Sequence, residues 1–553
     1  MGATGRRIAR MARSRIGARW GLSTSRFASL SGFIYSPVRS RFRGTAIDWE
    51  AQGMEGSGKP RVVVIGSGFG GLAIAVRLAA RGHPVTVLEK MDAPGGRAYV
   101  HRQDGYVFDA GPTIVTAPYL FEELWSLCGR RFADDVTLKR LDPFYEVRFD
   151  DGVSIAYTDD PARMRAQIER LSPVDAPAFD RFLETSRRIY DVAFAELADQ
   201  PFHSLWTLLK ALPDMARLGG YKTVWDMVAS HFRHPKLRVL FSFHPLLIGG
   251  NPLSTTAYYC LISHLERSLG VHYAMGGTGA LMSGIVALAE SMGVEFRYQS
   301  EVAGILSEQR RVTGVRLASG ETLSASVVVS NADVGWTYSR LLGDVPRRRW
   351  TNQRLARTSF SMSLFVWYFG TNRRYDDVYH HMMVLGPRYE ELLRDIFNRK
   401  VVADDCSLYL HRPTATDPAL APPGCDAFYV LSPVPNLRGG ADWRQIGESY
   451  RAKVQARLEE TVLPGLGAAL TTSRVMTPQT FQDELLSLHG AAFSIEPKLL
   501  QSAWFRPHNR SEELAGLYLV GAGTHPGAGL PGVLSSARIV DALVAEDWPQ
   551  AAA

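Results

Sequence analysis

The spacing of hydrophobic residues changes within the stretch RVVVIGSGFGGLAIAVRLAARGHPVTVLEK, residues 61–90. Its first five residues, 61–65, are almost all apolar and β-branched, which is typical of a strand buried on both faces of a parallel sheet. Apolar residues then recur with helical spacing until Gly82 ends the pattern. A second apolar run, 85–88, ends at Glu89. The pattern predicts a strand, a helix and a second parallel strand.

Two later segments carry patterns of the same kind. Residues 275–340 show a helical period followed by short strands and a hairpin. The apolar run 517–520 leads into GAGTHPGAGLPGVLSSA, residues 521–537, which is rich in glycine and proline. We predict a final strand, a glycine-rich turn and a helix that Gly532 and Val533 start.

The predicted fold class is α/β, a Rossmann-type domain that is split in sequence around inserted α+β regions. The two intervening segments are too long to be loops, so they are expected to form a substrate-binding part. The predicted division is a tail at 1–58, nucleotide-binding parts at 59–150, 275–340 and 511–548, a substrate- and membrane-associating insertion at 151–274, and a substrate-binding region at 341–510.

The first insertion contains an amphipathic segment, residues 201–229, with Pro213 expected to break it. Four large apolar side chains share one helical face: Trp206, Leu209, Leu212 and Met215. Trp and Lys or Arg beside Leu favour a helix that lies on a membrane surface, although an amphipathic core helix has the same pattern. The longest apolar run, SMSLFVWYFG, is too short to span a bilayer and predicts a buried strand.

The composition indicates that the main part of the chain is reduced and does not bind nucleic acid, and that the N-terminal segment differs from it. The formal charge is +7, but residues 1–53 contain ten Arg and only two acidic residues. The rest of the chain is close to neutral, which argues against a nucleic-acid partner. Two interpretations of the N-terminal segment remain open. It is a start-site artefact, with Met54 as the true start, or a disordered tail; alternatively, it is a transit peptide. The four cysteines form no CxxC pair, so we expect a reduced protein.

The first predicted strand–helix unit contains the motif G-x-G-x-x-G, formed by Gly66, Gly68 and Gly71. Gly66 permits a tight turn, Gly68 lets the backbone approach a pyrophosphate, and Gly71 lets helix and strand pack closely. The helix N-terminus offers free N–H groups to phosphate. Glu89 accepts hydrogen bonds from a ribose and repels a 2′-phosphate. These features together predict dinucleotide binding.

The segment DAPGGRAYV, residues 92–100, resembles the continuation of this motif in FAD enzymes of the amine-oxidase-like superfamily. The resemblance implies that Gly96 and Arg97 lie near the flavin or its phosphates, and that the backbone of Val302 contacts the adenine. A solvated surface arginine is the alternative for Arg97. A second G-x-G-x-x-G unit is lacking, so NAD(P)H is not the expected electron partner.

The C-terminal glycine-rich turn is expected to approach the phosphate and flavin end of FAD. Gly523 is expected to bring the backbone close, and Gly532 and Val533 to begin a helix whose N–H groups face the flavin. His525 is the one titratable side chain in this turn.

The sequence contains no GxSxG and no HExxH motif, and His380-His381 is a pair without spaced carboxylates. We therefore expect no metal and name no catalytic residue, because the flavin supplies the chemistry.

The chain resembles the bacterial-type phytoene desaturases over about residues 61–540. The stretches that carry the resemblance are VIGSGFGGLAIAVRL, PGGRAYV, FDAGPTIVT, DPFYEVRF, SFHPLLIGGNP, SLFVWYFG, SLYLHRPTATDP, FSIEPKLLQSAWFRPHN and LYLVGAGTHPGAGLPGV. Many FAD enzymes of the superfamily carry an acidic residue near the last motif, where this chain has Ala522. The matching desaturases also have GAG there.

The resemblance implies an FAD-dependent oxidoreductase of CH–CH groups in carotenoid biosynthesis. It desaturates 15-cis-phytoene stepwise to neurosporene or lycopene, by hydride transfer to flavin N5 and proton loss. It implies a peripheral protein on the cytoplasmic face of a membrane, oxygen or a quinone as electron acceptor, and allows a homo-oligomer. The alternatives are another carotenoid desaturase, acting on hydroxylated or methoxylated intermediates, and a carotenoid isomerase. A non-enzymatic isoprenoid-binding protein is disfavoured by Glu89 and Arg97.

Overall fold

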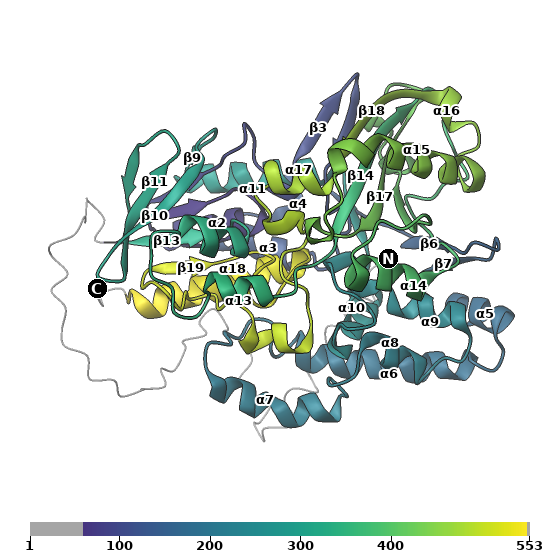
Figure 1. Cartoon of the computed structure of the whole chain (residues 1–553), viewed down its shortest axis with the longest axis horizontal. Coiled ribbons are helices and arrows are strands. Elements are labelled where there is room, and N and C mark those ends of the chain that lie inside the picture. Colours follow the sequence, from purple (N-terminus) through teal and green to yellow (C-terminus); the bar gives the residue numbers. More distant parts are fainter. Residues whose placement is uncertain (1–58, 550–553) are drawn as a thin grey trace. The chain divides into compact units, whose positions relative to one another are not determined.

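The computed structural model describes residues 59–549 (Figure 1). The predictions for the Arg-rich segment and for a start at Met54 lie outside these residues. The first region is built on a five-stranded parallel sheet, whose strands come from three separate parts of the chain and confirm the split α/β domain. Their order is β19 (Leu517–Leu519), β13 (Val327–Ser330), β1 (Val62–Ile65), β2 (Val85–Leu88) and β9 (Glu295–Arg297).

Both faces of this sheet are covered, which explains the unbroken apolar run of β1. Val62 and Val64 pack in the same core as the helices on one face, and Val63 and Ile65 pack with a second sheet on the other. The helices are α2 (Phe69–Ala80), α11 (Gly277–Ser291) and α18 (Leu530–Asp547). The second sheet is antiparallel and consists of β10 (Val302–Glu308), β11 (Arg311–Leu317) and β12 (Thr322–Ser324).

Helix α18 begins at Leu530, two residues before the start that the sequence predicts. Gly529 precedes it with a φ of +93°, and Pro531 occupies the first turn. Proline is preorganised for a first helical turn, because its missing N–H would have no partner there. Gly532 and Val533 therefore lie inside the first turn.

The second region is a seven-stranded mixed sheet. Its strand β14 (Ser363–Thr371), second from one edge, is the predicted buried strand, and all of its residues are buried. Phe365 and Trp367 pack toward α15 (Trp443–Thr461), whereas Leu364 and Val366 face a cavity. The strand order is β18 (Leu470–Met476), β14 (Ser363–Thr371), β17 (Asp426–Val434), β16 (Leu408–His411), β15 (His381–Val384), β6 (Tyr145–Arg148) and β7 (Ser154–Tyr157).

Helices from the first insertion cover the cavity side of this sheet (Figure 1). They are α5 (Pro161–Leu171), α6 (Ala176–Ala193), α8 (Val224–Ala229), α9 (Pro235–Ser242) and α10 (Leu261–Leu269). Helix α7 (Leu205–Arg217) packs instead beside Ala503–Phe505. The predicted break at Pro213 is wrong, because α7 continues through it. Pro213 is exposed, so water can hydrate the carbonyl that the missing N–H leaves unpaired.

Shorter elements connect these parts. Strands β3 (Val100–Gln103) and β4 (Tyr106–Asp109) form a hairpin, and β5 (Leu138–Arg140) pairs with β8 (His272–Ala274). The main short helices are α3 (Tyr119–Leu127), α4 (Phe132–Asp135), α13 (Asn352–Arg357), α14 (Tyr389–Arg394) and α17 (Pro478–Asp483).

Candidate active site

The turn between β1 and α2 has the geometry that its glycines predict. Gly66 has a φ of +90°, and its N–H donates to Leu88 O at 2.8 Å. A side chain at Gly71 would collide with the carbonyl oxygen of Gly66. Gly71 therefore lets the helix pack directly on the turn, and it does not itself line the cavity.

Gly68 caps the N-terminus of α2 and lines the cavity, where a Cβ would lie 2.9 Å from Asn331 Nδ2. Asn331 follows β13 directly, and its side chain fills the space between the two glycine-rich turns. A Cβ at Gly70 would lie 2.6 Å from Asn331 Oδ1, and one at Gly521 2.8 Å from it. The sequence analysis missed Asn331, although its place directly after an apolar strand marks the same sheet edge as Gly66.

Glu89 is buried at the carboxyl end of β2. Its Oε2 accepts from the backbone N–H and the hydroxyl of Ser67, at 2.8 and 2.7 Å, and its Oε1 accepts from Met91 N–H at 2.9 Å. These bonds fix the carboxylate on the cavity wall beside Val302. Oε1, which accepts one hydrogen bond, keeps a lone pair free for a ribose hydroxyl.

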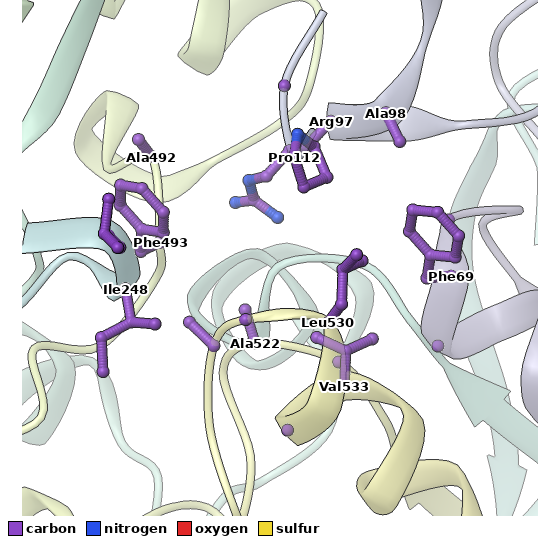
Figure 2. A pocket seen from close by; sticks show the side chains of 18 of the residues that line it. Phe69, Arg97, Ala98, Pro112, Ile248, Ala492, Phe493, Ala522, Leu530 and Val533 are labelled. Atoms are coloured by element: carbon purple, nitrogen blue, oxygen red, sulfur yellow. The ribbon is translucent and has the colours of Figure 1, made fainter. Parts of the chain in front are cut away.

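Arg97 extends into the cavity opposite Leu530 and Val533 (Figure 2). Its Nη2 donates to Ser487 Oγ at 2.7 Å and lies 3.8 Å from Asp333 Oδ2. Burial lowers the pKa of Arg97, and the charge of Asp333 partly opposes this shift. Arg97 Nε and Asp333 Oδ2 are buried without a hydrogen-bond partner. Arg97 Nε is thus a free hydrogen-bond donor, and Asp333 Oδ2 a free acceptor, for a bound group.

The C-terminal glycine-rich turn forms the opposite wall, with Ala522, Leu530 and Val533 facing Arg97 (Figure 2). Gly523 does not face the cavity; a Cβ there would lie 2.5 Å from Val334 Cγ1, so this glycine packs against α12 (Val334–Trp336). The structure brings all the predicted cofactor residues except Gly71 and Gly523 to one cavity: Gly66, Gly68, Glu89, Gly96, Arg97, Val302, Gly532 and Val533.

His525 also lines this cavity and is buried. Burial, with a smaller contribution from Arg506, lowers the pKa of His525 to about 3. Neither ring nitrogen has a hydrogen-bond partner. The imidazole is therefore neutral at physiological pH and does not act there as an acid.

The cavity, of about 590 Å³, continues from the glycine turns into an apolar limb between the seven-stranded mixed sheet and the inserted helices. Aliphatic and aromatic side chains dominate this limb. Its wall includes Phe243, Leu246, Leu247, Tyr258, Tyr259, Ile262, Met362, Leu364, Val366, Met383, Tyr409, Tyr429 and Leu431. A polar cradle and a long apolar limb thus meet in one space.

Glu266 lies in the wall of the apolar limb, on α10, and is almost fully buried. Its Oε2 accepts a short hydrogen bond from Tyr145 Oη and lies 3.4 Å from His244 Nε2. Burial and the carboxylate raise the pKa of Tyr145 well above 10, so this phenol remains a donor. The sequence analysis missed Glu266, because it lies in a mixed stretch, LISHLERSL, that reads as an ordinary amphipathic helix.

The residues of the cradle fit the expected FAD. The turn at Gly66 and Gly68 leaves room for a phosphate at a helix N-terminus, and Glu89 is held where a ribose is expected. The unpaired Arg97 Nε and Asp333 Oδ2 supply polar partners beside the apolar limb.

Comparison with known proteins supports this description. The family model for flavin containing amine oxidoreductase matches residues 69–542. A neurosporene-forming phytoene desaturase of Cereibacter sphaeroides is 50% identical, over 89% of this chain and 95% of its own length. A lycopene-forming phytoene desaturase of Pseudescherichia vulneris is 47% identical, over 88% of this chain and 99% of its own length.

Solved structures confirm the fold at much lower identity. A redesigned putrescine oxidase has a TM-score of 0.61 and 15% identity, over 88% of this chain and 98% of its own. A cyclohexylamine oxidase of Brevibacterium oxydans has a TM-score of 0.57 and 16% identity, over 88% of this chain and 99% of its own.

Proposed function

Since this chain belongs to the family of flavin containing amine oxidoreductases, we propose that it is an FAD-dependent phytoene desaturase. It introduces successive C=C bonds into 15-cis-phytoene and yields neurosporene or lycopene. Desaturases that form each of these products align with nearly the whole chain, so an isomerase or a desaturase of oxygenated carotenoids is not favoured.

The continuity of the cavity is the observation that carries this proposal. The glycine cradle and Arg97 lie at one end, and the apolar limb between the inserted helices and β14 lies at the other. Phytoene is a hydrocarbon without a polar group, and burying each CH₂ contributes about 0.8 kcal/mol. A limb lined by aliphatic and aromatic side chains therefore fits such a substrate.

We propose Glu266 as the group that receives the proton. When bound, FAD supplies the acceptor for the hydride that leaves the substrate. Loss of a hydride leaves an allylic cation, and the electron-rich faces of Tyr409 and Tyr429 favour positive charge in the limb. Glu266 lines the same limb, and its carboxylate is oriented by the hydrogen bond from Tyr145 Oη. Transfer of the neighbouring proton to this oxygen completes one C=C bond.

We also propose that the protein docks on the cytoplasmic face of a membrane through α7. Four side chains of this helix are exposed by 45% or more: Leu205, Trp206, Leu209 and Leu212. Met215, on the same helix, lines the cavity, and α7 packs beside Ala503–Phe505, whose first residue also lines it. The exposed apolar face thus adjoins one entrance to the limb. Within residues 59–549, no helix is long and apolar enough to cross a bilayer.

Expression in cells that accumulate phytoene tests the function. We expect extracted pigments to be coloured, red for four desaturation steps and yellow for three. Purified protein should carry FAD, measured by its visible absorbance. Colourless extracts from cells that contain soluble, FAD-loaded protein would exclude phytoene as the substrate.

The electron acceptor needs its own measurement. We propose oxygen or a quinone, because the described residues contain one strand–GxGxxG–helix unit and no second unit for NAD(P)H. Reduced enzyme should reoxidise when air or a soluble quinone is added and remain reduced with NADP⁺. Reoxidation by NADP⁺ under anaerobic conditions would overturn this proposal.

A further inference from the structure

Three buried histidines meet where β15 and β16 pair. His381 and His411 face each other across the two antiparallel strands, and His380 directly precedes β15. One ring nitrogen of each histidine lies within 4.8 Å of a ring nitrogen of each of the others. The imidazole of His380 is also packed 4.6 Å, between ring centroids, from the phenol ring of Tyr273.

This cluster contains an unusual group of unpaired polar atoms. The Nε2 atoms of His380, His381 and His411 and the hydroxyl of Tyr273 are all buried without a hydrogen-bond partner. Buried polar atoms in folded proteins are nearly always paired with protein, water or an ion. His380 Nδ1 already meets Thr416 Oγ1 at 2.7 Å, so His380 Nε2 is the nitrogen of this ring that is left for a bound species.

The donor geometry favours a metal ion. His381 Nδ1 makes hydrogen bonds with His411 Nδ1 at 3.2 Å and with Tyr409 Oη at 2.8 Å, and a metal ion held by the two imidazoles would replace the bond between them. Two imidazole nitrogens bound tetrahedrally to zinc, each at about 2.0–2.1 Å, lie about 3.3–3.4 Å apart. A neutral imidazole has one free lone pair for a metal.

The surrounding charges are mixed. Asp109 and Asp417 act electrostatically on Tyr273, whereas Lys139 and Arg412 act on His380. The charge of Arg412 is offset by ion pairs with Asp426 at 2.9 Å and Asp376 at 3.2 Å, so it does not exclude a cation. The cluster itself contains no carboxylate, which disfavours calcium and magnesium.

We propose that His380, His381 and His411 bind a zinc ion, with Tyr409 Oη beside the open position. The site ties β15 to β16 directly behind Tyr409 and Tyr429, which line the apolar limb. Zinc has no redox chemistry, so its role here is to hold this wall of the limb in place. The proposal does not depend on the identity of the substrate.

Metal analysis of tag-free, FAD-loaded protein tests the site. We expect zinc close to equimolar with FAD after purification without chelators. His381→Gln and His411→Gln should each lower zinc content about tenfold or more while FAD content is kept. His231→Gln is the matched control, because His231 binds Met227 O and Thr185 outside the cluster; its zinc content should be unchanged.

A cobalt titration keeps the test decisive if those variants do not fold. Wild-type protein stripped of metal and supplied with Co²⁺ should gain ligand-field absorbance beyond the flavin band, and added Zn²⁺ should displace it. Wild-type protein that is zinc-free on purification and binds neither Co²⁺ nor Zn²⁺ would overturn the proposal. Equal zinc content in wild type and both folded glutamine variants would overturn it too, because the metal would then lie elsewhere.

Discussion

Individual residues divide the cavity into a polar end and an apolar end. Gly68 acts through shape, because the absence of a side chain leaves space. Glu89 acts through hydrogen bonding, because its carboxylate is held in a fixed position. Glu266 acts through charge, because it places a carboxylate among apolar side chains. Substitutions at the two ends should therefore change different observables, flavin content at one and turnover at the other.

We expect Gly68→Val to abolish FAD binding, because even its Cβ would lie 2.9 Å from Asn331 Nδ2 in the space for the pyrophosphate. Glu89→Ala should be milder and lower FAD affinity about tenfold, the effect of losing a hydrogen bond to a charged group. Bound FAD per chain, from visible absorbance, is the measurement. Gly447→Ala is the control, since its Cβ would lie an unstrained 3.6 Å from Thr477 Cγ2. Full flavin content in Gly68→Val would show that the cradle is misassigned.

Glu266→Gln should lower the rate of phytoene desaturation about 100-fold or more, the usual effect of removing a positioned proton acceptor. FAD content should not change, because Glu266 lies in the apolar limb and not in the cradle. Turnover of phytoene in liposomes, normalised to bound FAD, is the measurement. Glu290→Gln is a matched exposed control on α11. A rate within twofold of wild type would remove Glu266 from the mechanism.

At the scale of elements, helix termini join parts of the chain that are distant in sequence. Asp109, the last residue of β4, accepts from Thr278 N–H at 2.9 Å and Gly279 N–H at 3.2 Å in the first turn of α11. This contact joins the β3–β4 hairpin to the parallel-sheet region. A negative charge at a helix N-terminus is favourable, but burial of Asp109 opposes its ionisation.

Burial raises the pKa of Asp109 from its ordinary value of 3.8 to about 6, and the hydrogen bonds to Thr278 and Gly279 oppose the shift. Because the pKa of Asp109 is higher in the folded protein than in the unfolded chain, the protonated side chain stabilises the fold fully below pH 4. This contribution is lost as the pH rises through 6. The shift of about two units corresponds to about 3 kcal/mol. Relative to wild type, Asp109→Asn should therefore gain stability between pH 4 and 7.5. Urea unfolding of both proteins across this range measures the difference, and a constant difference would contradict the assignment.

At the scale of the whole molecule, helix α7 of the first insertion combines an exposed apolar face with a residue, Met215, that lines the cavity. The α7 face, formed by Leu205, Trp206, Leu209 and Leu212, is exposed. Lys210 lies over the Trp206 ring, with Nζ 5.6 Å from the centroid. A basic side chain beside exposed Trp and Leu suits an interface with anionic lipid.

The double variant Trp206→Glu/Leu209→Glu should lower binding to anionic liposomes by about tenfold or more. Burying each of the two native side chains in lipid contributes at least ~1.5 kcal/mol to the binding free energy, and the variant loses both contributions. Desaturation of phytoene supplied in liposomes should fall with it, while FAD content is retained. Liposome co-sedimentation is the measurement. Val174→Glu, at a site 65% exposed and outside α7, is the control. Unchanged sedimentation of the double variant would exclude α7 as the docking surface.

The sequence alone determined the nucleotide-binding half of this protein. Its information is local there: an apolar β-branched run, glycines at fixed spacing and an acidic residue at the end of the next strand all lie within thirty residues. The final helix was predicted within two residues, since glycine and proline mark such boundaries directly. The family resemblance rested on these motifs, on the C-terminal glycine-rich turn and on the other stretches quoted above, over about residues 61–540.

Only the tertiary structure decided which distant side chains meet. Asn331 reaches both glycine-rich turns because β13 lies beside β1 in the sheet. Glu266 lines the apolar limb because α10 packs over the seven-stranded mixed sheet. The sequence could not indicate this, since an acid in an amphipathic stretch is ordinarily solvated. His381 and His411 are thirty residues apart and meet only through the pairing of β15 with β16. Periodicity fixes which face of an element is buried, whereas side-chain contacts between elements depend on strand order and register, which no local pattern encodes.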